Sequence, residues 1–265
     1  TPVFFLTFFW LGRKNPAWRQ GWLQRCGSVT QNIKPNALWL HAASVGEVMA
    51  AAPLIKSFQA KYPDIDILVT TFTPTGAEQV KQLFSGKVFH QYLPIDHPLF
   101  FKRFVKQLKP GLLVIIEREL WPGMLSVCAR HSIPVLLANA RMSQKSAESY
   151  QRFPILIRFM LDKLSMVAVQ DHTDGQRYLD LGLPENKLNV TGSMKFDISI
   201  DDAVKAEGEG LRKQWGEKRP VLALASSHAD ADERLLALLP KLQQQINDIL
   251  LLLIPRHPER FDAVS

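Results

Sequence analysis

The chain has 265 residues, of which 46% are hydrophobic and 22% are charged, and its net charge is +7. These values exclude a disordered or collagen-like chain and allow one large domain or two small ones. The positive charge favours anionic partners. Nucleic acid is not expected among them, because the sequence has no aromatic-basic RNA motif and no helix-turn-helix pattern. Cys26 and Cys128 match no metal or redox spacing, and they fit either a buried structural role or reduced thiols, consistent with a cytosolic environment.

Residues 1–36 combine aromatic and basic side chains and contain no acidic residue. The apolar run from Val3 to Leu11 is too short to span a bilayer, which needs about 20 residues. Basic residues follow this run, whereas a signal peptide carries its positive charge ahead of the run. The segment therefore favours contact with an anionic membrane surface over a shortened signal peptide or a core helix. Because the chain starts at Thr1 rather than at Met, we expect further residues in front of it.

From Ala37 onward, short apolar runs alternate with longer amphipathic ones. This alternation predicts a parallel sheet with helices on both faces, in a domain over residues 37–197. The predicted strands are Leu38–Ala42, Ile65–Thr70, Val88–Leu93, Leu112–Ile116, Val135–Ala138, Met166–Val169 and Leu188–Val190. The predicted helices are Val48–Lys61, Gly76–Leu83, Phe100–Leu108, Leu120–Arg130 and Asp174–Leu181. The last of these has Asp171 and Thr173 as candidate caps and Gly182 just past its end.

Residues 198–219 are polar and predict a partly helical crossing between two domains. The alternation restarts over residues 220–265, with strands at Val221–Ala225 and Ile249–Ile254 and a helix at Asp232–Gln245. One strand–helix–strand unit cannot close a second doubly wound domain. We therefore expect the natural protein to continue beyond Ser265.

Candidate chemistry gathers after the predicted strands, because ligands of open α/β sheets bind at the carboxyl ends of strands. Glu47 follows the first strand, together with Ser44 and Gly46, in the first turn of a helix. It is either a general base or an acid that complements the helix dipole. Position alone favours the second interpretation by about two to one.

Further charged residues follow other strands. Glu117 comes directly after Leu112–Ile116, and the alternative to a catalytic role is an ion-paired helix start in which Glu119 caps and Trp121 packs. The cationic candidates are Lys195, Arg141 and Arg256, the last preceded by Pro255. Such cations suit a phosphate or carboxylate ligand, although a lone lysine is more often simply solvated.

Some patterns predict no site. Asp64 and Asp66 have the spacing of a metal-binding acid pair, but they open a strand rather than follow one. Asp230 and Asp232 lie at a helix start, where capping is the simpler role. No metal-ligand cluster, dinucleotide fingerprint or P-loop is visible, so neither a metal nor a cofactor is expected.

Taken together, several strings in this order resemble the 3-deoxy-D-manno-octulosonic acid (Kdo) transferases of lipopolysaccharide synthesis. The strings are Ser44-Val45-Gly46-Glu47, Thr70-Thr71-Phe72-Thr73-Pro74-Thr75-Gly76, Glu117-Arg118-Glu119-Leu120-Trp121-Pro122, Ala138-Asn139-Ala140-Arg141, Thr191-Gly192-Ser193-Met194-Lys195-Phe196-Asp197 and Pro255-Arg256-His257-Pro258-Glu259-Arg260-Phe261. They cover nearly the whole chain, which makes the match far more specific than any one motif.

The resemblance implies an α/β fold of the GT-B type, with two Rossmann-like doubly wound domains of which the second is incomplete in this chain. It also implies an acceptor site in the first domain and a nucleotide site in the second. The reaction would be metal-independent and inverting, moving Kdo from CMP-Kdo to a lipid A precursor (lipid IVA) at the cytoplasmic face of the bacterial inner membrane.

Residue by residue, the resemblance makes Glu47 the catalytic base and gives Glu117 and Lys195 roles in stabilising the transition state. Pro255 and Arg256 match part of the CMP site, and Ser44, Gly46 and Arg141 are further substrate-binding candidates. The chain departs from the family pattern at Arg118, where many members carry Thr. It also stops before the family's Asn-Pro-Leu-Glu stretch, which helps to hold CMP.

Two other classes of function stay open on the sequence. One is a different enzyme on the same architecture, such as a sugar-nucleotide epimerase or another sugar transferase. The other is a non-catalytic membrane-binding module that senses a nucleotide or a lipid. Product analysis separates the first from a Kdo transferase, because an epimerase needs no acceptor and releases no CMP from CMP-Kdo.

Overall fold

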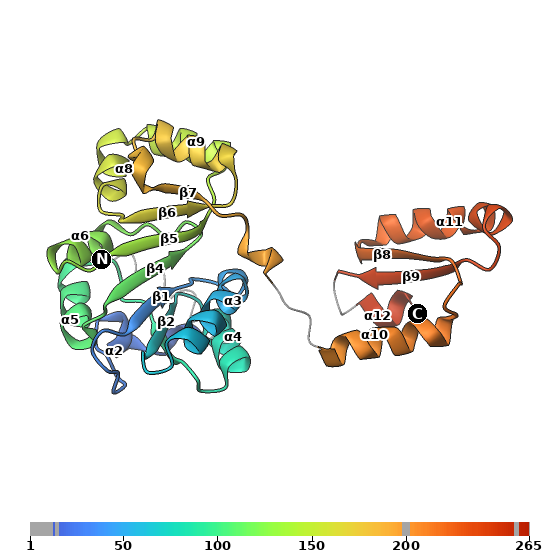
Figure 1. Cartoon of the computed structure of the whole chain (residues 1–265), viewed down its shortest axis with the longest axis horizontal. Helices are drawn as coiled ribbons and strands as arrows, with labels where there is room; N and C mark the ends of the chain where they lie inside the picture. The colour runs from blue at the N-terminus through green and yellow to red at the C-terminus, as the bar shows by residue number, and fades with distance from the viewer. Residues whose placement is uncertain (1–12, 14–15, 198–201, 257–259, 265) are drawn as a thin grey trace. The chain divides into compact units, whose positions relative to one another are not determined.

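The computed structural model describes residue 13 and residues 16–197, 202–256 and 260–264. The chain divides into two compact units, Thr1–Ile198 (unit 1) and Ser199–Ser265 (unit 2), which Figure 1 draws from blue to red along the chain. Unit 1 contains a seven-stranded sheet and unit 2 a two-stranded sheet. All strand pairs in both sheets are parallel.

The sheet of unit 1 has the strand order β3-β2-β1-β4-β5-β6-β7. Its strands are β1 (Leu38–His41), β2 (Ile67–Thr71), β3 (Phe89–Tyr92), β4 (Leu112–Ile116), β5 (Val135–Ala140), β6 (Met166–Val169) and β7 (Leu188–Val190). Every strand predicted for this unit is present, with ends shifted by at most two residues. The order reverses between β1 and β4, and in doubly wound sheets this switch point opens a crevice at the carboxyl ends of the strands.

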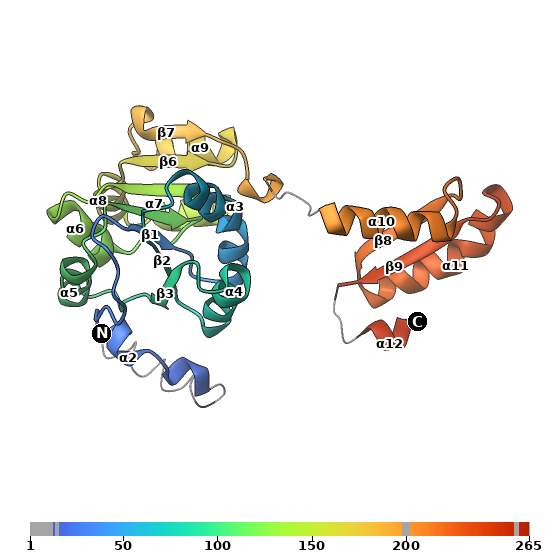
Figure 2. The same cartoon turned by 60° about the horizontal axis from the view of Figure 1, so that its bottom comes forward.

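Helices cover both faces of this sheet (Figures 1 and 2). On one face, α3 (Val45–Lys61) and α4 (Pro74–Phe84) supply the buried side chains. The second core receives its side chains from α5 (Pro98–Leu108), α6 (Pro122–Arg130), α7 (Gln144–Gln151), α8 (Pro154–Leu161) and α9 (His172–Asp180). The predicted doubly wound arrangement is therefore confirmed for unit 1.

Neighbouring residues of β1 belong to different cores, because successive side chains of a strand point to opposite faces. Leu40 packs against α3 and α4, whereas Trp39 packs against α5, with its ring centroid 4.8 Å from that of Phe104. The buried indole N–H of Trp39 donates a 2.9 Å hydrogen bond to the hydroxyl of Thr70 on β2. Burying an aromatic side chain of this size contributes about 1.5–3 kcal/mol, provided that its polar atom is satisfied in this way.

The ends of α9 show which cap predictions hold. Asp171 accepts a 2.8 Å hydrogen bond from the backbone N–H of Asp174, so the predicted N-cap is confirmed. Thr173 lies inside the helix, so its predicted capping role is wrong. Gly182 has a φ of +97°, a left-handed conformation that a glycine just past a helix end adopts without strain.

Two helices between β5 and β6, α7 and α8, were not predicted from the sequence. The same holds for several short elements, namely η1 (Pro16–Arg19), α2 (Trp22–Arg25), η2 (Glu185–Lys187) and η3 (Met194–Phe196). Within the described ranges, no helix is long and apolar enough to cross a bilayer. The run Val3–Leu11, predicted to contact a membrane, lies outside the described residues.

Unit 2 consists of α10 (Asp202–Trp215), β8 (Val221–Ser227), α11 (Ala229–Gln245), β9 (Leu250–Pro255) and α12 (Phe261–Val264). Both predicted strands and the helix between them are present. The predicted helical character of residues 198–219 is also confirmed, because α10 occupies most of that segment. The N-cap of α11 is His228, so the capping role predicted for Asp230 and Asp232 is wrong, and both acids lie in the first helical turn instead.

Candidate active site

The switch point between β1 and β4 brings two predicted catalytic acids to one edge of the sheet. Glu47 lies in the first turn of α3, just after β1, and Glu117 follows the last residue of β4. The two strands are hydrogen-bonded neighbours, with His41 opposite Ile115. Both carboxylates are half-buried. The structure therefore places them together at the edge where ligands of this sheet type bind.

Glu47 is held from both sides of its carboxylate. One oxygen, Oε2, accepts a 2.5 Å hydrogen bond from the backbone N–H of Ala43, and Oε1 accepts one of 3.3 Å from the hydroxyl of Ser44. Ser44 is the N-cap of α3, but its hydroxyl caps no backbone N–H. The carboxylate thus satisfies an N–H group at the start of the helix, as the structural interpretation of Glu47 predicts.

Burial nevertheless raises the pKa of Glu47 to about 7, against the opposing effect of the Ala43 hydrogen bond. The charges of Glu119 and Glu117 raise this pKa further. A carboxylate whose pKa lies near neutral pH exchanges protons readily under physiological conditions, as a general base must. Glu47 therefore combines a structural hydrogen bond with the ionisation behaviour of a catalytic group.

Gly46 leaves open space beside Glu47. It is exposed, and a Cβ atom built at this position meets no atom within 4 Å. Its φ is not in the left-handed region, so nothing in the described structure requires glycine here. Glycine inside a helix costs about 0.5–1 kcal/mol relative to alanine. Gly208 and Gly210 have the same open space, so the substrate-binding role of Gly46 stays a prediction.

Glu117 has a strained backbone. Its φ is +64°, in the left-handed region that residues other than glycine rarely adopt. Two hydrogen bonds hold the turn, one of 3.0 Å from the N–H of Glu117 to the carbonyl of Ala138 and one of 3.0 Å from the N–H of Arg118 to that of Ile116. Strain of this kind costs about 1–3 kcal/mol and concentrates at functional sites.

The alternative interpretation predicted that Glu119 caps the helix after β4, and this prediction is wrong. The N-cap of α6 is Trp121, and the first N–H groups of the helix donate to Asp96, at 3.2 Å from Gly123 and 3.0 Å from Met124. Glu119 accepts a 3.0 Å hydrogen bond from the indole N–H of Trp121 instead. The role of Asp96 was not predicted from the sequence, because the contact joins two loops that are far apart along the chain.

An aromatic row extends from this edge to the N-terminal helices. Phe72, just after β2, stacks on Trp121 with ring centroids 6.1 Å apart and meets Trp18 edge-on at 6.3 Å. Arg25 lies 4.2 Å from the ring centroid of Tyr92 and donates a 3.1 Å hydrogen bond to the carbonyl of Phe72.

Arg25 is fully buried, and burial lowers its pKa to about 10, so the guanidinium stays charged at neutral pH. The sequence had placed Arg25 among the basic residues of a membrane-contacting segment. Its burial against the end of β2 removes it from that set.

Lys195 and Arg141 lie at the carboxyl ends of β7 and β5. Lys195 is exposed on η3, and the backbone N–H of its neighbour Met194 donates a 3.1 Å hydrogen bond to Oδ1 of Asn139. Asn139 is itself buried, with a φ of +53°. The sequence analysis includes Asn139 only as part of the string Ala138-Asn139-Ala140-Arg141. In the structure, its side chain holds the turn that carries Lys195.

Arg141 is exposed beside Met142, which is held by α9. The N–H of Met142 donates to Asp174 at 3.1 Å, and its carbonyl accepts a 2.8 Å hydrogen bond from Arg177. The strand-end loop that carries Arg141 is thus fixed by a second element, although Arg141 itself faces solvent.

In unit 2, the predicted nucleotide-site residues Pro255 and Arg256 lie at the carboxyl end of β9. Arg256 is exposed, and its backbone N–H donates to the carbonyl of Ser227 at 3.0 Å, while Pro255 is half-buried. Arg260 donates to the same carbonyl at 3.2 Å and forms a 2.7 Å ion pair with Asp232. This pair, which fixes the strand ends around Arg256, was not predicted from the sequence.

No group of three or more His, Cys, Asp or Glu side chains is placed to hold a metal ion in the part of the chain that the structure describes. Asp66, part of the acid pair set aside above, accepts a 2.7 Å hydrogen bond from the backbone N–H of Lys34 and is structural. A cavity of about 470 Å³ lies beside η3, lined by residues that include Asn139, Thr191 and Gly192.

The chain resembles known proteins over most of its length. A model of the 3-deoxy-D-manno-octulosonic-acid transferase (kdotransferase) family matches residues 20–198. The 3-deoxy-D-manno-octulosonic acid transferase of Haemophilus influenzae is 41% identical over 96% of this chain and 60% of its own length. The transferase of Rickettsia felis is 36% identical over 86% of this chain and 48% of its own length. The chain thus spans about half to three fifths of the length of these relatives.

Solved structures of similar fold are more distant in sequence. A UDP-GlcNAc 2-epimerase from Neisseria meningitidis, bound to UDP-GlcNAc, has a TM-score of 0.57 at 14% identity and covers 86% of this chain and 68% of its own. A glycosyltransferase from Rickettsia africae has a TM-score of 0.54 at 14% identity, with coverages of 87% and 64%. These likenesses confirm the α/β fold of the GT-B type, of which this chain contains the first domain and part of the second.

The family model covers most of unit 1, including the edge that carries Glu47, Glu117, Arg141 and Lys195. On the strength of this match and of the relatives' identity, the chain belongs to the 3-deoxy-D-manno-octulosonic acid transferase family.

Proposed function

We propose that the protein transfers Kdo from CMP-Kdo to a hydroxyl group of a lipid A precursor (lipid IVA), with inversion at the anomeric carbon, in lipopolysaccharide core synthesis. The observation that carries the proposal is Glu47, a half-buried carboxylate with a pKa of about 7 at the carboxyl edge of β1, next to Glu117. Family membership supports Kdo transfer, and the acids at this edge supply the group that the transfer needs.

In the proposed step, the carboxylate of Glu47 accepts the proton of an acceptor hydroxyl while the hydroxyl oxygen forms a bond to the anomeric carbon of Kdo. The bond from that carbon to the phosphate oxygen of CMP breaks, and CMP leaves with the electron pair. Glu47 then releases its proton to water. General-base assistance of this kind contributes about 10²–10⁴-fold in rate.

Charged neighbours suit the other demands of the step. The transition state has oxocarbenium character, so a carboxylate such as Glu117 stabilises it electrostatically. Lys195 and Arg256 are exposed cations at strand ends, which fits the Kdo carboxylate and the CMP phosphate as ligands. Ser44, Gly46 and Arg141 line the rest of the acceptor edge in this proposal, and Pro255 supports the CMP site.

The lipid acceptor places the protein at a membrane. We propose peripheral attachment at the cytoplasmic face of the inner membrane, with residues 1–36 contacting an anionic surface. The sequence of that segment, rich in aromatic and basic residues, supports this location.

The test is to incubate the native-length protein with CMP-Kdo and lipid IVA and to follow lipid mass and CMP release together. We expect a gain of one or more Kdo units, and we expect Glu47→Gln to lower turnover by about 10²–10⁴-fold. Glu78→Gln is the matched control, because it makes the same change at an exposed position on α4. Unchanged lipid mass with intact CMP-Kdo and folded protein would show that this donor and acceptor are wrong.

A further inference from the structure

Helix α8 carries apolar side chains on both of its faces. Ile157, Met160 and Leu161 are buried in the core of unit 1. The outward side exposes the α8 ridge, defined by Phe153, Ile155, Leu156 and Phe159, whose exposed fractions are 63%, 86%, 45% and 42%. A helix that only covers a sheet needs one apolar stripe and keeps its other side polar. The core of unit 1 therefore does not explain the ridge.

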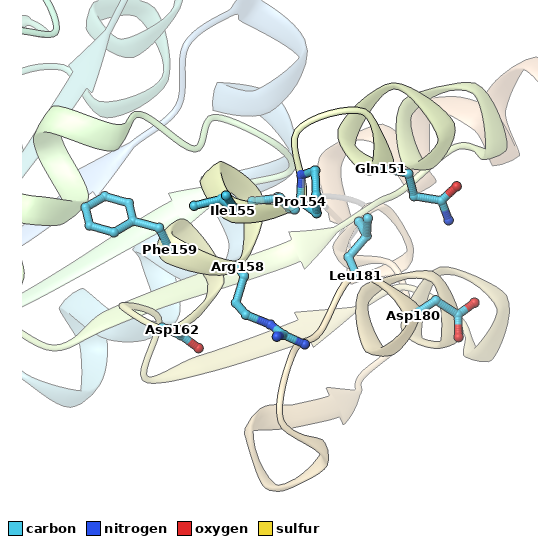
Figure 3. Close-up of a pocket in the computed structure, with 9 residues that line it drawn as sticks. Gln151, Pro154, Ile155, Arg158, Phe159, Asp162, Asp180 and Leu181 are labelled. Atoms are coloured by element: carbon cyan, nitrogen blue, oxygen red, sulfur yellow. The ribbon is translucent and has the colours of Figure 1, made fainter.

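Cations border the ridge. Arg152 precedes it and Arg158 lies within the helix, both exposed. Figure 3 shows Arg158 extending from α8 in a different direction from Ile155 and Phe159, beside a pocket of about 510 Å³. Lys163 places its ammonium group 3.3 Å from the ring centroid of Phe159 and donates to the carbonyl of the same residue at 3.1 Å. Apolar side chains with cations at their margin suit a surface that is apolar inside and negatively charged outside.

A groove of about 440 Å³ runs along the ridge. Its lining residues are Arg152, Phe153, Pro154, Ile155, Leu156 and Phe159. Five of these six side chains are apolar, and the sixth is a cation. An acyl chain against the apolar lining and a phosphate headgroup beside Arg152 would match this distribution.

The size of the ridge argues against a second copy of the chain as its occupant. Its four residues expose roughly 500 Å², whereas a stable protein interface buries about 800 Å² on each partner. Insertion into a bilayer interface has no such minimum, because each apolar side chain gains free energy in proportion to its own buried area.

We infer that the α8 ridge inserts into the interface of an anionic lipid bilayer, as a contact separate from residues 1–36. The inference does not depend on which sugar is transferred, so its test contains no sugar nucleotide and its failure would leave the proposed transfer unaffected.

The experiment uses the full chain with a Cys26→Ser background, because Cys26 is half-buried whereas Cys128 is fully buried. An environment-sensitive fluorophore is attached at Ile155→Cys, and at Gln82→Cys on α4 as the control. Vesicles of phosphatidylcholine, with or without phosphatidylglycerol, carry spin-labelled lipids as quenchers. We expect the fluorophore at residue 155 to brighten and be quenched with anionic vesicles, while that at residue 82 stays in water.

Binding constants give a second measurement. We expect Ile155→Ser to weaken partitioning into anionic vesicles by about tenfold, and Arg152→Gln by about fivefold. Ile65→Ser, the same change at another exposed isoleucine, should have no effect.

Two outcomes would overturn the inference. One is vesicle-bound protein whose residue-155 fluorophore remains unquenched, which would assign binding to residues 1–36 alone. The other is brightening that depends on protein concentration without vesicles, which would assign the ridge to a second copy of the chain.

Discussion

The backbone N–H of Ala43 donates a 2.5 Å hydrogen bond to Oε2 of Glu47, four residues further along the chain. This bond joins the end of β1 to the first turn of α3, and so it aligns the carboxylate with the carboxyl edge of the sheet. It also stabilises the ionised form, against the burial that raises the pKa of Glu47 to about 7. The two opposing effects keep the carboxylate both oriented and close to its point of titration at neutral pH.

The first prediction concerns the pH dependence of transfer. Because a general base must be ionised, kcat/KM should rise with pH through an apparent pKa of about 7. Of the two like charges that raise the pKa of Glu47, that of Glu119 has the larger effect, so Glu119→Gln should lower this pKa. A pH–rate profile of each protein measures both. An unchanged profile in Glu119→Gln would mean that Glu119 does not influence the base.

The second prediction concerns stability and follows from the same pKa. The pKa of Glu47 is higher in the folded state than its usual 4.5, so protonation of this carboxylate stabilises the folded state relative to the unfolded state. The stability that this group contributes is fully present below the unfolded pKa and is lost as pH rises toward about 7.

Glu47→Gln should therefore raise the free energy of unfolding at about pH 8 by about 1 kcal/mol, after allowance for solvent screening of a half-buried carboxylate, and by much less at about pH 5. Urea denaturation at both pH values measures the difference, and Glu78→Gln again serves as the control. An equal effect at both values would contradict a raised pKa.

The third prediction separates folding from binding at Gly46. A methyl group at this position enters open space, so Gly46→Ala should raise the free energy of unfolding by about 0.5–1 kcal/mol. If a substrate occupies the same space, transfer falls while stability rises. Denaturation and transfer assays on one preparation test this opposition. Gly210→Ala on α10 is the matched control, because its Cβ also meets no atom within 4 Å.

The fourth prediction concerns the strain at Glu117. Glu117→Ala keeps a Cβ atom in the left-handed conformation, whereas Glu117→Gly removes it. The glycine variant should therefore be about 1 kcal/mol more stable than the alanine variant, with both equally impaired in transfer. Thermal unfolding of the pair measures this difference. Equal stability would show that the turn relaxes without strain.

The fifth prediction concerns Asn139, which holds the turn with Lys195. Asn139→Ala removes the acceptor of the 3.1 Å hydrogen bond from the backbone N–H of Met194. The loss of a part-buried hydrogen bond costs about 1–3 kcal/mol. Hydrogen exchange at the Met194 amide should accelerate, and transfer should fall by a factor similar to that of Lys195→Ala. Unchanged exchange would show that the turn is held by other contacts.

Local sequence was enough to predict the strands of both units. The run Leu112–Ile116 is uniformly apolar and lies between Gly111 and Glu117, so its limits follow from the local sequence alone. The predicted strands also identify the residues that follow them, and a parallel sheet brings the carboxyl ends of all its strands to one edge. Glu47, Glu117 and Lys195 are therefore candidates on the sequence alone. Helices α7 and α8 were missed, since Pro154 interrupts the segment and the exposed apolar face of α8 obscures its amphipathic period.

The sequence by itself determined the fold class, the strands and the residue types at the strand ends, because these depend on side-chain polarity over a few neighbouring positions. Only the tertiary structure decided which groups meet. Asp96 caps α6 across 27 residues of chain, Asn139 holds the N–H of Met194 across 55, and Arg25 is buried against Phe72. The pKa of Glu47 depends in the same way on burial and on Glu119 and Glu117. Burial and hydrogen bonds between distant segments arise only when the chain has folded, and local sequence patterns carry no record of them.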